Sequence, residues 1–346
     1  MRFGVIGSGS WATALAKILT DNGQKVNWWI RNASAIRHIE TRHHNPTYLT
    51  SVYFDTSLLS LSDSVKTTVA SSDCVVMAVP SAYAAETLAQ LEKKALHGKK
   101  VLSAIKGILP EQNLLLNDYL VREFGFLPAD YFTVMGPCHA EEVAAEKLSY
   151  LTFSGQDETA TREVAAYFAT EYLNTVINED VYGVQYAAIL KNIYALGAGI
   201  AHGLEYGDNF LSVLIANCAD EMAGFLQKVG IRHIEVGVHE GRRDPVSHRR
   251  RANYAASVYL GDLLVTCYSL YSRNRTFGNM IGKGYSVKAA QLELNMVAEG
   301  YNASKCIYLI NKDIGADMPI AGMIYRILWE NVKAGSGFKQ IEPYLV

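Results

Sequence analysis

The sequence lacks the features of a membrane protein, a metalloprotein or a disulfide-bonded protein. No apolar run approaches the roughly 20 residues that a membrane-spanning helix needs. The nine histidines show no metal-ligand spacing, and the five cysteines are scattered without a Cys-x-x-Cys pair. An odd, unclustered set of cysteines is typical of reduced thiols. We therefore expect a cytoplasmic protein that holds no metal.

An excess of charge of one sign is also missing. The 32 lysines and arginines nearly balance the 34 aspartates and glutamates, so no general electrostatic attraction to nucleic acid or to an anionic membrane is expected. With 346 residues, of which 49% are hydrophobic and 19% charged, the chain is long for one domain, and we expect two. It starts directly on a strand-like run, so we expect no signal peptide ahead of the fold.

The first dozen residues are the most informative segment. Residues 3–6 predict a buried strand and residues 11–19 an amphipathic helix, with a Gly-x-Gly-x-x-Ala turn between them. Gly7 permits a tight turn, and Gly9 lets the backbone approach a pyrophosphate beside the N–H groups of the helix N-terminus. The pattern predicts a dinucleotide site, and an ordinary strand–turn–helix is the alternative for the motif taken alone.

The first half of the chain alternates between strand-like and helix-like segments. A helix is predicted over residues 33–42, and another over 82–96 with Ser81 as its cap. Such alternation predicts a doubly wound parallel sheet. The further predicted strands cover residues 25–30, 74–79, 101–105, 131–135, 150–153 and 175–177.

Helical periodicity dominates after about Asp180, so we expect domains over residues 1–180 and 181–346. An arginine-rich segment, 241–251, holds five arginines and is interpreted as a solvated loop rather than a phosphate-binding or oligomer-contact segment. The predicted helices of the second domain cover residues 186–201, 210–229, 252–270 and 287–298.

The position that reads the adenosine ribose in a dinucleotide fold carries no carboxylate here. An Asp or Glu about twenty residues after the glycines would bind the 2′-hydroxyl of NAD. The second strand instead ends at Arg31, which can pair with a 2′-phosphate or stack on adenine. We therefore hypothesise that NADPH is accepted, and an exposed arginine without a discriminating role is the alternative.

Several motifs resemble those of the bacterial NAD(P)-dependent glycerol-3-phosphate dehydrogenases, in the same order along the chain. The resemblance implies a Rossmann-type α/β sheet followed by an all-helical C-terminal domain. It also implies reversible reduction of dihydroxyacetone phosphate by NADPH or NADH, a role in phospholipid synthesis, and a homodimer. The motifs are Gly-Ser-Gly-Ser-Trp-Ala-Thr-Ala-Leu-Ala (7–16), Ala-Val-Pro-Ser (78–81), Ile-Lys-Gly (105–107), Gly-Pro-Cys-His-Ala-Glu-Glu (136–142), Leu-Lys-Asn-Ile-Tyr-Ala-Leu-Gly-Ala-Gly (190–199), Leu-Gly-Asp-Leu-Leu-Val-Thr-Cys (260–267), Ser-Arg-Asn-Arg-Thr-Phe-Gly (272–278) and Val-Ala-Glu-Gly-Tyr (297–301).

The resemblance makes Lys191 the general acid for reduction. A ketone that accepts hydride develops negative charge on oxygen, and a lysine can both stabilise that charge and donate a proton. From the residues alone, the favoured interpretation is that Lys191 lies on a polar helix stripe with Asn192. Asp262 and Thr266 are four residues apart and share a helix face, where Asp262 could hold Lys191 or a substrate hydroxyl.

The remaining site residues are also implied by the resemblance. Lys106 would contact both cofactor and substrate, and Ser272, Arg273 and Asn274 would clamp the substrate phosphate, for which arginine offers paired hydrogen bonds. Cys138 stands where the family usually has Thr, Ser or Asn. Gly136 and Cys138 would contact substrate, and the cofactor contacts would be Gly7, Gly9, Ser10, Trp11, Arg31, Lys106, Ala140, Arg273, Val297 and Glu299.

Three other functions remain open from the sequence. The first is a reductase of the same architecture for another substrate, such as a ketopantoate or 6-phosphogluconate type enzyme. The second is an aldolase-like enzyme with Lys191 as a Schiff-base nucleophile. The third is a redox sensor that binds nucleotide without turnover. The phosphate clamp and the pair of Lys106 and Lys191 disfavour the related reductase. The glycine turn would have no purpose in the aldolase-like enzyme, and the phosphate clamp would have none in the sensor.

Overall fold

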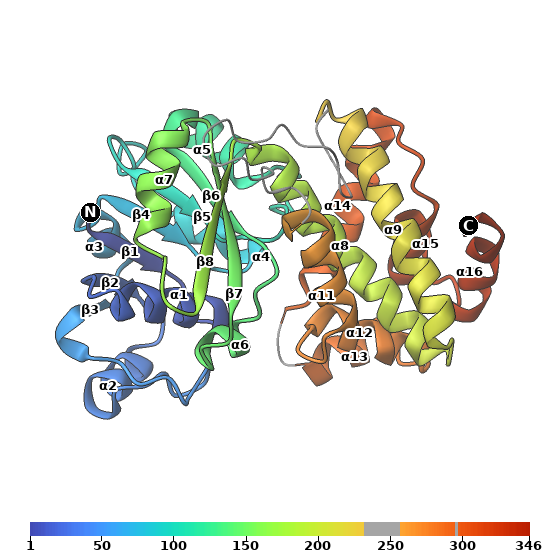
Figure 1. Ribbon diagram of the computed structural model, residues 1–346, viewed down its shortest axis with the longest axis horizontal. Coiled ribbons are helices and arrows are strands. Elements are labelled where there is room, and N and C mark those ends of the chain that lie inside the picture. The colour runs from blue at the N-terminus through green and yellow to red at the C-terminus, as the bar shows by residue number, and fades with distance from the viewer. Residues whose placement is uncertain (232–256, 295–296) are drawn as a thin grey trace, which may run out of the picture. The chain divides into compact units, whose positions relative to one another are not determined.

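The protein is described from a computed structural model over residues 1–231, 257–294 and 297–346, and its chain divides into two compact units (Figure 1). Unit 1 is Met1–Val181 and unit 2 is Tyr182–Val346. The arginine-rich segment 241–251 lies outside the described residues.

Unit 1 is built on an eight-stranded sheet of order β3-β2-β1-β4-β5-β6-β7-β8. Neighbouring strands are parallel apart from β6 and β7, which pair antiparallel. The prediction of a doubly wound α/β sheet is confirmed. The strands are β1 (Phe3–Ile6), β2 (Val26–Trp29), β3 (Leu59–Ser62), β4 (Cys74–Met77), β5 (Lys100–Ser103), β6 (Tyr131–Met135), β7 (Ser149–Gly155) and β8 (Leu173–Asn178).

Two features of the sheet were not predicted from the sequence. Edge strand β3 is four residues long and alternates leucine with serine, so it lacks the apolar run that marks the central strands. The antiparallel direction of β7 was not expected either, because side-chain periodicity reports that a segment is a strand but not which way it runs.

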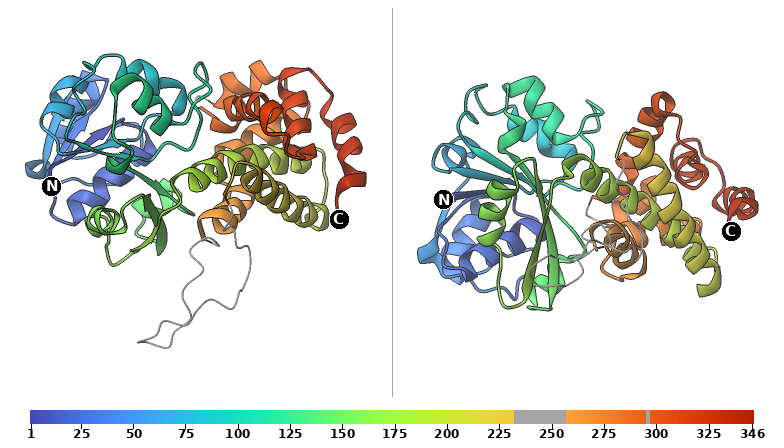
Figure 2. Two further views of the ribbon diagram at one scale, coloured as in Figure 1. Left: turned by 90° about the horizontal axis from the view of Figure 1, so that it is seen from above. Right: turned by 45° about the horizontal axis from the view of Figure 1, so that its top comes forward.

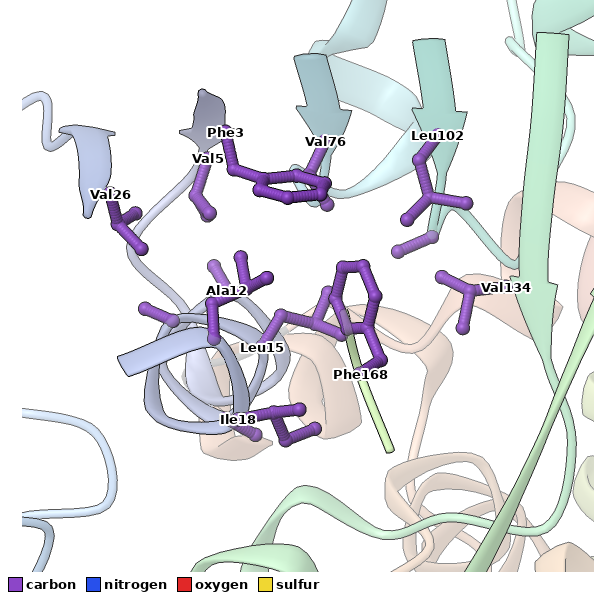
Figure 3. Packing of buried hydrophobic residues seen from close by; sticks show 14 of the residues in the cluster. Phe3, Val5, Ala12, Leu15, Ile18, Val26, Val76, Leu102, Val134 and Phe168 are labelled. Atoms are coloured by element: carbon purple, nitrogen blue, oxygen red, sulfur yellow. The ribbon is translucent and has the colours of Figure 1, made fainter. Parts of the chain in front are cut away.

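Alternate residues of the strands feed two hydrophobic cores, one on each face of the sheet. Phe3 and Val5 belong to the first core with the buried side of α1 (Ser10–Asp21), whereas Ile6 belongs to the second. Figure 3 shows Leu15 of α1 packed on the sheet in the first core. The other helices of unit 1 are α2 (Ala33–Arg42), α3 (Val65–Ala70), α4 (Ser81–Leu88), α5 (Leu116–Phe124), α6 (Ala140–Ala144) and α7 (Glu158–Ala166).

The predicted helix over 82–96 was too long, and its cap was misplaced. Helix α4 begins at Ser81, with Pro80 in the capping position, and ends at Leu88. Tight turns follow, because the chain must return to place Lys100 of β5 beside Cys74 of β4.

Unit 2 contains helices and no strand within its described residues (Figure 2). Nowhere in the described chain is a helix long and apolar enough to cross a membrane. The helices are α8 (Val181–Gly203, whose first residue closes unit 1), α9 (Asp208–Lys228), α11 (Asp262–Tyr268), α12 (Arg273–Gly282), α13 (Val287–Leu294), α14 (Glu299–Ile314), α15 (Pro319–Trp329) and α16 (Ala334–Ile341).

Two predicted helices of this unit were too long, and the helix expected over 186–201 was too short, because α8 begins at Val181. Part of the helix expected over 252–270 lies outside the described residues. The described part is a π-helical turn, η3 (Ser257–Gly261), followed by α11, which ends at Tyr268. The helix expected over 287–298 ends as α13 at Leu294, and Ala298 caps the separate helix α14. Apolar residues continue at helical spacing through both places, so the sequence pattern does not mark where these helices end.

Helices α8 and α12 approach each other closely enough to need glycine at the crossing. A Cβ atom at Gly199 would overlap backbone at Arg275, and one at Gly278 would overlap the carbonyl of Leu196. Gly203 and Gly282 repeat the arrangement one turn further along. The crossing fixes the start of α12 against the helix that carries Lys191.

Candidate active site

The glycine turn at the end of β1 has the geometry of a phosphate-binding turn. Gly7 has φ +131°, and a Cβ atom there would lie 2.6 Å from the carbonyl oxygen of Ala78, so glycine is required. At Gly9 an added Cβ would meet nothing within 4 Å, which leaves open space beside the backbone. Ser10 then begins α1, whose first N–H groups have no partner within the helix. These residues fit a dinucleotide pyrophosphate.

Lys106 lies beside Trp11, the second residue of the helix that follows the glycine turn. Its Nζ is 5.4 Å from the ring centroid of Trp11 and donates a hydrogen bond to the carbonyl oxygen of Gly136, 3.3 Å away. The structure therefore brings together three predicted residues from α1 and from the ends of β5 and β6. A cation at this edge can attract phosphate or a developing negative charge.

Cys138 and Ala140 follow on the segment after β6. The thiol of Cys138 is buried and is 3.6 Å from the carbonyl oxygen of Tyr150, to which it donates. Ala140 is the first residue of α6 and is buried. Because the thiol donates to the protein backbone, its proton is not available to a substrate in this arrangement.

Arg31 is exposed just beyond the end of β2. The next residue, Asn32, caps α2 with its side chain, which accepts a hydrogen bond from the Ser34 amide. The guanidinium of Arg31 thus stands at the predicted position, accessible to a ligand.

Lys191 and Asp262 form a buried ion pair inside unit 2. Lys191 is 4% exposed and Asp262 is 1% exposed, and the lysine Nζ bonds to Asp262 Oδ1. Lys191 therefore does not lie on a solvated polar stripe. A buried ion pair needs close geometry to offset the loss of hydration, so the carboxylate fixes where the ammonium points.

Two side chains near this pair, Thr266 and Cys267, belong to the same helix as Asp262. Thr266 donates from Oγ1 to the carbonyl oxygen of Asp262 at 2.6 Å, so its hydroxyl serves the backbone of its own helix rather than the carboxylate. Burial raises the pKa of the neighbouring Cys267 thiol to about 12, so that thiol stays protonated. The π-helical turn η3 leads directly into Asp262, and such turns often occur at functional positions.

The predicted phosphate clamp lies at the N-terminus of α12. Ser272 caps that helix by accepting from the Arg275 amide at 3.2 Å, which leaves its hydroxyl proton for another acceptor. Asn274 bridges two helices: it donates to Asn192 Oδ1 at 2.9 Å and accepts from the Gly300 amide at 3.0 Å. Both bonds of Asn274 thus hold neighbouring helices together. Arg273 is partly buried and is the cation of the predicted clamp.

The predicted Val297 and Glu299 lie at the start of α14. Val297 and Glu299 are partly buried, and Glu299 is the first residue of the helix. The amide of Gly300 ties this end of α14 to Asn274, so the two predicted sets are connected through one hydrogen bond.

Family models match both units. Residues 2–161 match the N-terminal part of the NAD-dependent glycerol-3-phosphate dehydrogenases, and residues 180–338 match the C-terminal part. The chain belongs to this family. The resemblance drawn from the motifs is thereby confirmed, and the oxidoreductase fold with an NAD(P)-binding Rossmann domain follows from it.

Bacterial relatives named glycerol-3-phosphate dehydrogenase [NAD(P)+] align over nearly the whole chain. The protein of Streptococcus equi subsp. zooepidemicus is 34% identical over 327 residues, covering 94% of this chain and 91% of its own. That of Bacillus subtilis is 33% identical over 345 residues, covering 97% and 92%.

Solved structures agree in fold. A glycerol-3-phosphate dehydrogenase from Coxiella burnetii has a TM-score of 0.86 at 24% identity, over 98% of both chains. A ketopantoate reductase from Ralstonia eutropha has a TM-score of 0.57 at 14% identity, over 98% of this chain and 100% of its own. The ketopantoate reductase fold is therefore similar to that of this chain, but less so than the glycerol-3-phosphate dehydrogenase fold.

The sequence analysis did not identify one buried carboxylate of unit 2, Glu221, which connects α9 to α8 and α15. Glu221 on α9 accepts hydrogen bonds from the amides of Ile320 and Ala321 at 2.8 and 2.9 Å, and so caps α15. Tyr194, one turn from Lys191 on α8, donates to the same carboxylate at 3.1 Å. Burial raises the pKa of Glu221 to about 7, although the two amides oppose the shift. Two features of the sequence could have indicated this contact. Glu221 stands among the apolar residues of α9, and Pro319 marks the start of α15.

Proposed function

We propose that the chain catalyses reversible reduction of dihydroxyacetone phosphate to sn-glycerol 3-phosphate with NADPH or NADH. Membership of the dehydrogenase family supports the reaction. The observation that carries it is the buried Lys191–Asp262 pair on the two motifs that resemble the family's catalytic segments. A buried ammonium that is held in place by a carboxylate suits a developing alkoxide.

The roles of the residues follow from the chemistry of ketone reduction. When bound, the nicotinamide supplies the hydride. Lys191 stabilises the negative charge on the carbonyl oxygen and donates the proton, and it accepts that proton in the oxidation direction. Asp262 orients Lys191, and Arg273 binds the phosphate dianion through charge-assisted hydrogen bonds.

The remaining assignments complete the proposal. Residues 1–180 bind the dinucleotide and 181–346 the substrate. A cytoplasmic location agrees with the five cysteines, which are all buried and form no disulfide. We also propose a homodimer and a role in supplying the phospholipid backbone. Proposed cofactor contacts are Gly7, Gly9, Ser10, Trp11, Arg31, Lys106, Ala140, Arg273, Val297 and Glu299, and proposed substrate contacts are Lys106, Gly136, Cys138, Lys191, Asp262, Ser272, Arg273 and Asn274, with Thr266 beside the catalytic pair.

The direct test follows NADPH and NADH absorbance with dihydroxyacetone phosphate as the acceptor. Oxidation of either nucleotide supports the proposal. Nucleotide binding without turnover would point to a sensor, and turnover with ketopantoate but not dihydroxyacetone phosphate would point to the related reductases. Borohydride trapping of a substrate–lysine adduct without nucleotide would instead indicate Schiff-base chemistry.

Arg31→Glu is expected to shift the cofactor preference from NADPH towards NADH. The substitution removes the cation available to a 2′-phosphate and supplies a carboxylate for a ribose 2′-hydroxyl. The ratio of kcat/KM values for the two nucleotides measures the effect, and we expect it to change at least about tenfold. Arg162→Glu, an exposed arginine on α7, makes the same charge change as a control. An unchanged ratio in Arg31→Glu would contradict the assignment.

Arg273→Ala is expected to lower kcat/KM for dihydroxyacetone phosphate by at least about tenfold. Each charge-assisted hydrogen bond to phosphate is worth roughly 1.5–3 kcal/mol, so the loss of two bonds would lower efficiency several hundred-fold. Initial rates at varied substrate concentration measure the change. Arg326→Ala, a partly exposed arginine on α15, is the control. If both variants behave alike, Arg273 does not bind the phosphate.

A further inference from the structure

All three carbonyl groups of the glycine turn, at residues 7–9, accept side-chain hydrogen bonds. The indole Nε1 of Trp28 on β2 donates to Gly7 O at 2.7 Å, and Thr13 Oγ1 on α1 donates to Gly9 O at 3.0 Å. Asn45 Nδ2, from the segment after α2, donates to Ser8 O at 3.1 Å. Three separate parts of unit 1 therefore hold three successive carbonyls.

Asn45 is the residue that links this set. It is 3% exposed, and its Nδ2 also lies 3.0 Å from Thr13 Oγ1. Its Oδ1 accepts from the amides of Thr47 and Tyr48, both at 3.0 Å, so every polar atom of the side chain is used and its orientation is fixed.

The same segment is also held by packing at its other end. Phe54 is buried, and its ring lies 5.3 Å from the ring of Trp28, which holds the Gly7 carbonyl. The amide of Phe54 donates to His43 O at 2.7 Å, which closes the segment on itself. The segment between His43 and Phe54 is therefore an ordered loop that touches the glycine turn through Asn45.

The hydrogen bonds to the three carbonyls matter for the binding of a negatively charged pyrophosphate. A peptide carbonyl that faces a phosphate repels it, whereas a peptide N–H attracts it. The carbonyls of the turn are occupied by donors from the protein, and the Gly7 amide donates to the Trp29 carbonyl at 3.4 Å. The N–H groups that can face an anion are those that follow, at the start of α1. A turn that is fixed before binding loses less conformational entropy when the ligand arrives.

We propose that Asn45 is a positioning residue for the dinucleotide pyrophosphate, acting through the Ser8 carbonyl and Thr13. The inference rests on the proposed binding of NAD(P)H. It assigns a role in cofactor affinity to a residue of the loop after α2, which lies 36 positions beyond Gly9 in the sequence.

The test compares two ligands in wild type and Asn45→Ala. ADP-ribose contains the pyrophosphate, and adenosine 2′-phosphate does not. We expect the Kd of ADP-ribose and of NADPH to rise roughly tenfold and that of adenosine 2′-phosphate to stay within about twofold. Asn22→Ala is the matched control, because Asn22 Nδ2 also donates to a distant backbone carbonyl, that of Tyr167, at 3.1 Å. It should leave all three constants unchanged.

Hydrogen exchange in the nucleotide-free protein gives a readout that is independent of binding. Asn45→Ala should speed the exchange of amides at residues 7–12 beyond any change in Asn22→Ala. Should the variant fold poorly, Thr13→Val tests the same network with little change in volume. The double variant Asn45→Ala/Thr13→Val should weaken ADP-ribose less than the two single effects combined, because the residues share one network.

Two results would overturn the proposal. One is equal weakening of ADP-ribose and adenosine 2′-phosphate, which would mean that Asn45 shapes the adenosine end or the fold in general. The other is unchanged ADP-ribose affinity together with unchanged exchange of the turn. If wild type binds neither NADPH nor ADP-ribose, the proposed function fails, and the exchange data still report whether Asn45 orders the turn.

Discussion

Lys191→Met is expected to lower kcat for dihydroxyacetone phosphate reduction by at least about a thousandfold. The substitution removes both the proton donor and the cation that faces the developing alkoxide, and each contributes roughly 10² or more in comparable sites. The Kd for NADPH should stay within about twofold, because Lys191 is not part of the glycine turn. Single-turnover rates and nucleotide titration measure the two quantities.

A structural effect must be separated from this catalytic one. Removing the ammonium leaves the carboxylate of Asp262, 1% exposed, without its charge partner, which costs about 3–5 kcal/mol of stability in typical buried pairs. The double variant Lys191→Met/Asp262→Asn removes the buried charge and should regain most of the lost thermal stability. It should remain inactive. Activity that returns together with stability would show that Lys191 acts on the fold alone.

Gly278→Ala is expected to destabilise unit 2 by about 3 kcal/mol or more, lowering its Tm by roughly 6–12 °C. The added methyl group would overlap the backbone carbonyl of Leu196 on α8, and a backbone cannot move aside as a flexible side chain can. Scanning calorimetry of wild type and variant measures the shift. Gly199→Ala, which makes the reciprocal overlap from α8, should act alike.

Gly224→Ala provides the matched control for the crossing. Gly224 lies on the exposed side of α9, and an added Cβ would meet nothing within 4 Å. Alanine there should stabilise by roughly 0.5–1 kcal/mol, because glycine is the poorer helix former. Gly278→Ala with unchanged Tm would mean that α8 and α12 do not cross this closely.

The crossing also matters for the site, since it sets the start of α12 against α8. Asn274 bonds to Asn192 next to Lys191, and this bond depends on the register of the two helices. A variant at Gly278 that still folds should therefore raise the KM for dihydroxyacetone phosphate as Arg273 shifts away from its place. A comparison with the Tm of the same variant separates the two effects.

The sequence was informative wherever one segment carries the whole signal. The strand, glycine turn and helix at residues 3–21 were predictable because local apolar periodicity and two glycines determine them. Helix breaks at η3 and before α14 were not predictable, because apolar residues continue through them and the breaks depend on what packs against the chain. The order of the motifs was sufficient to predict the family, which the family models confirmed.

By itself, the sequence determined the α/β architecture, the family and the places where a nucleotide turn and a catalytic lysine should occur. Only the tertiary structure decided that Lys191 is buried against Asp262, since the two are 71 positions apart and no periodicity connects them. It also decided that Asn45 holds the glycine turn and that Glu221 caps α15. The physical reason is common to all three: burial makes an unpaired polar group costly, so each one pairs with whichever distant segment the fold brings near.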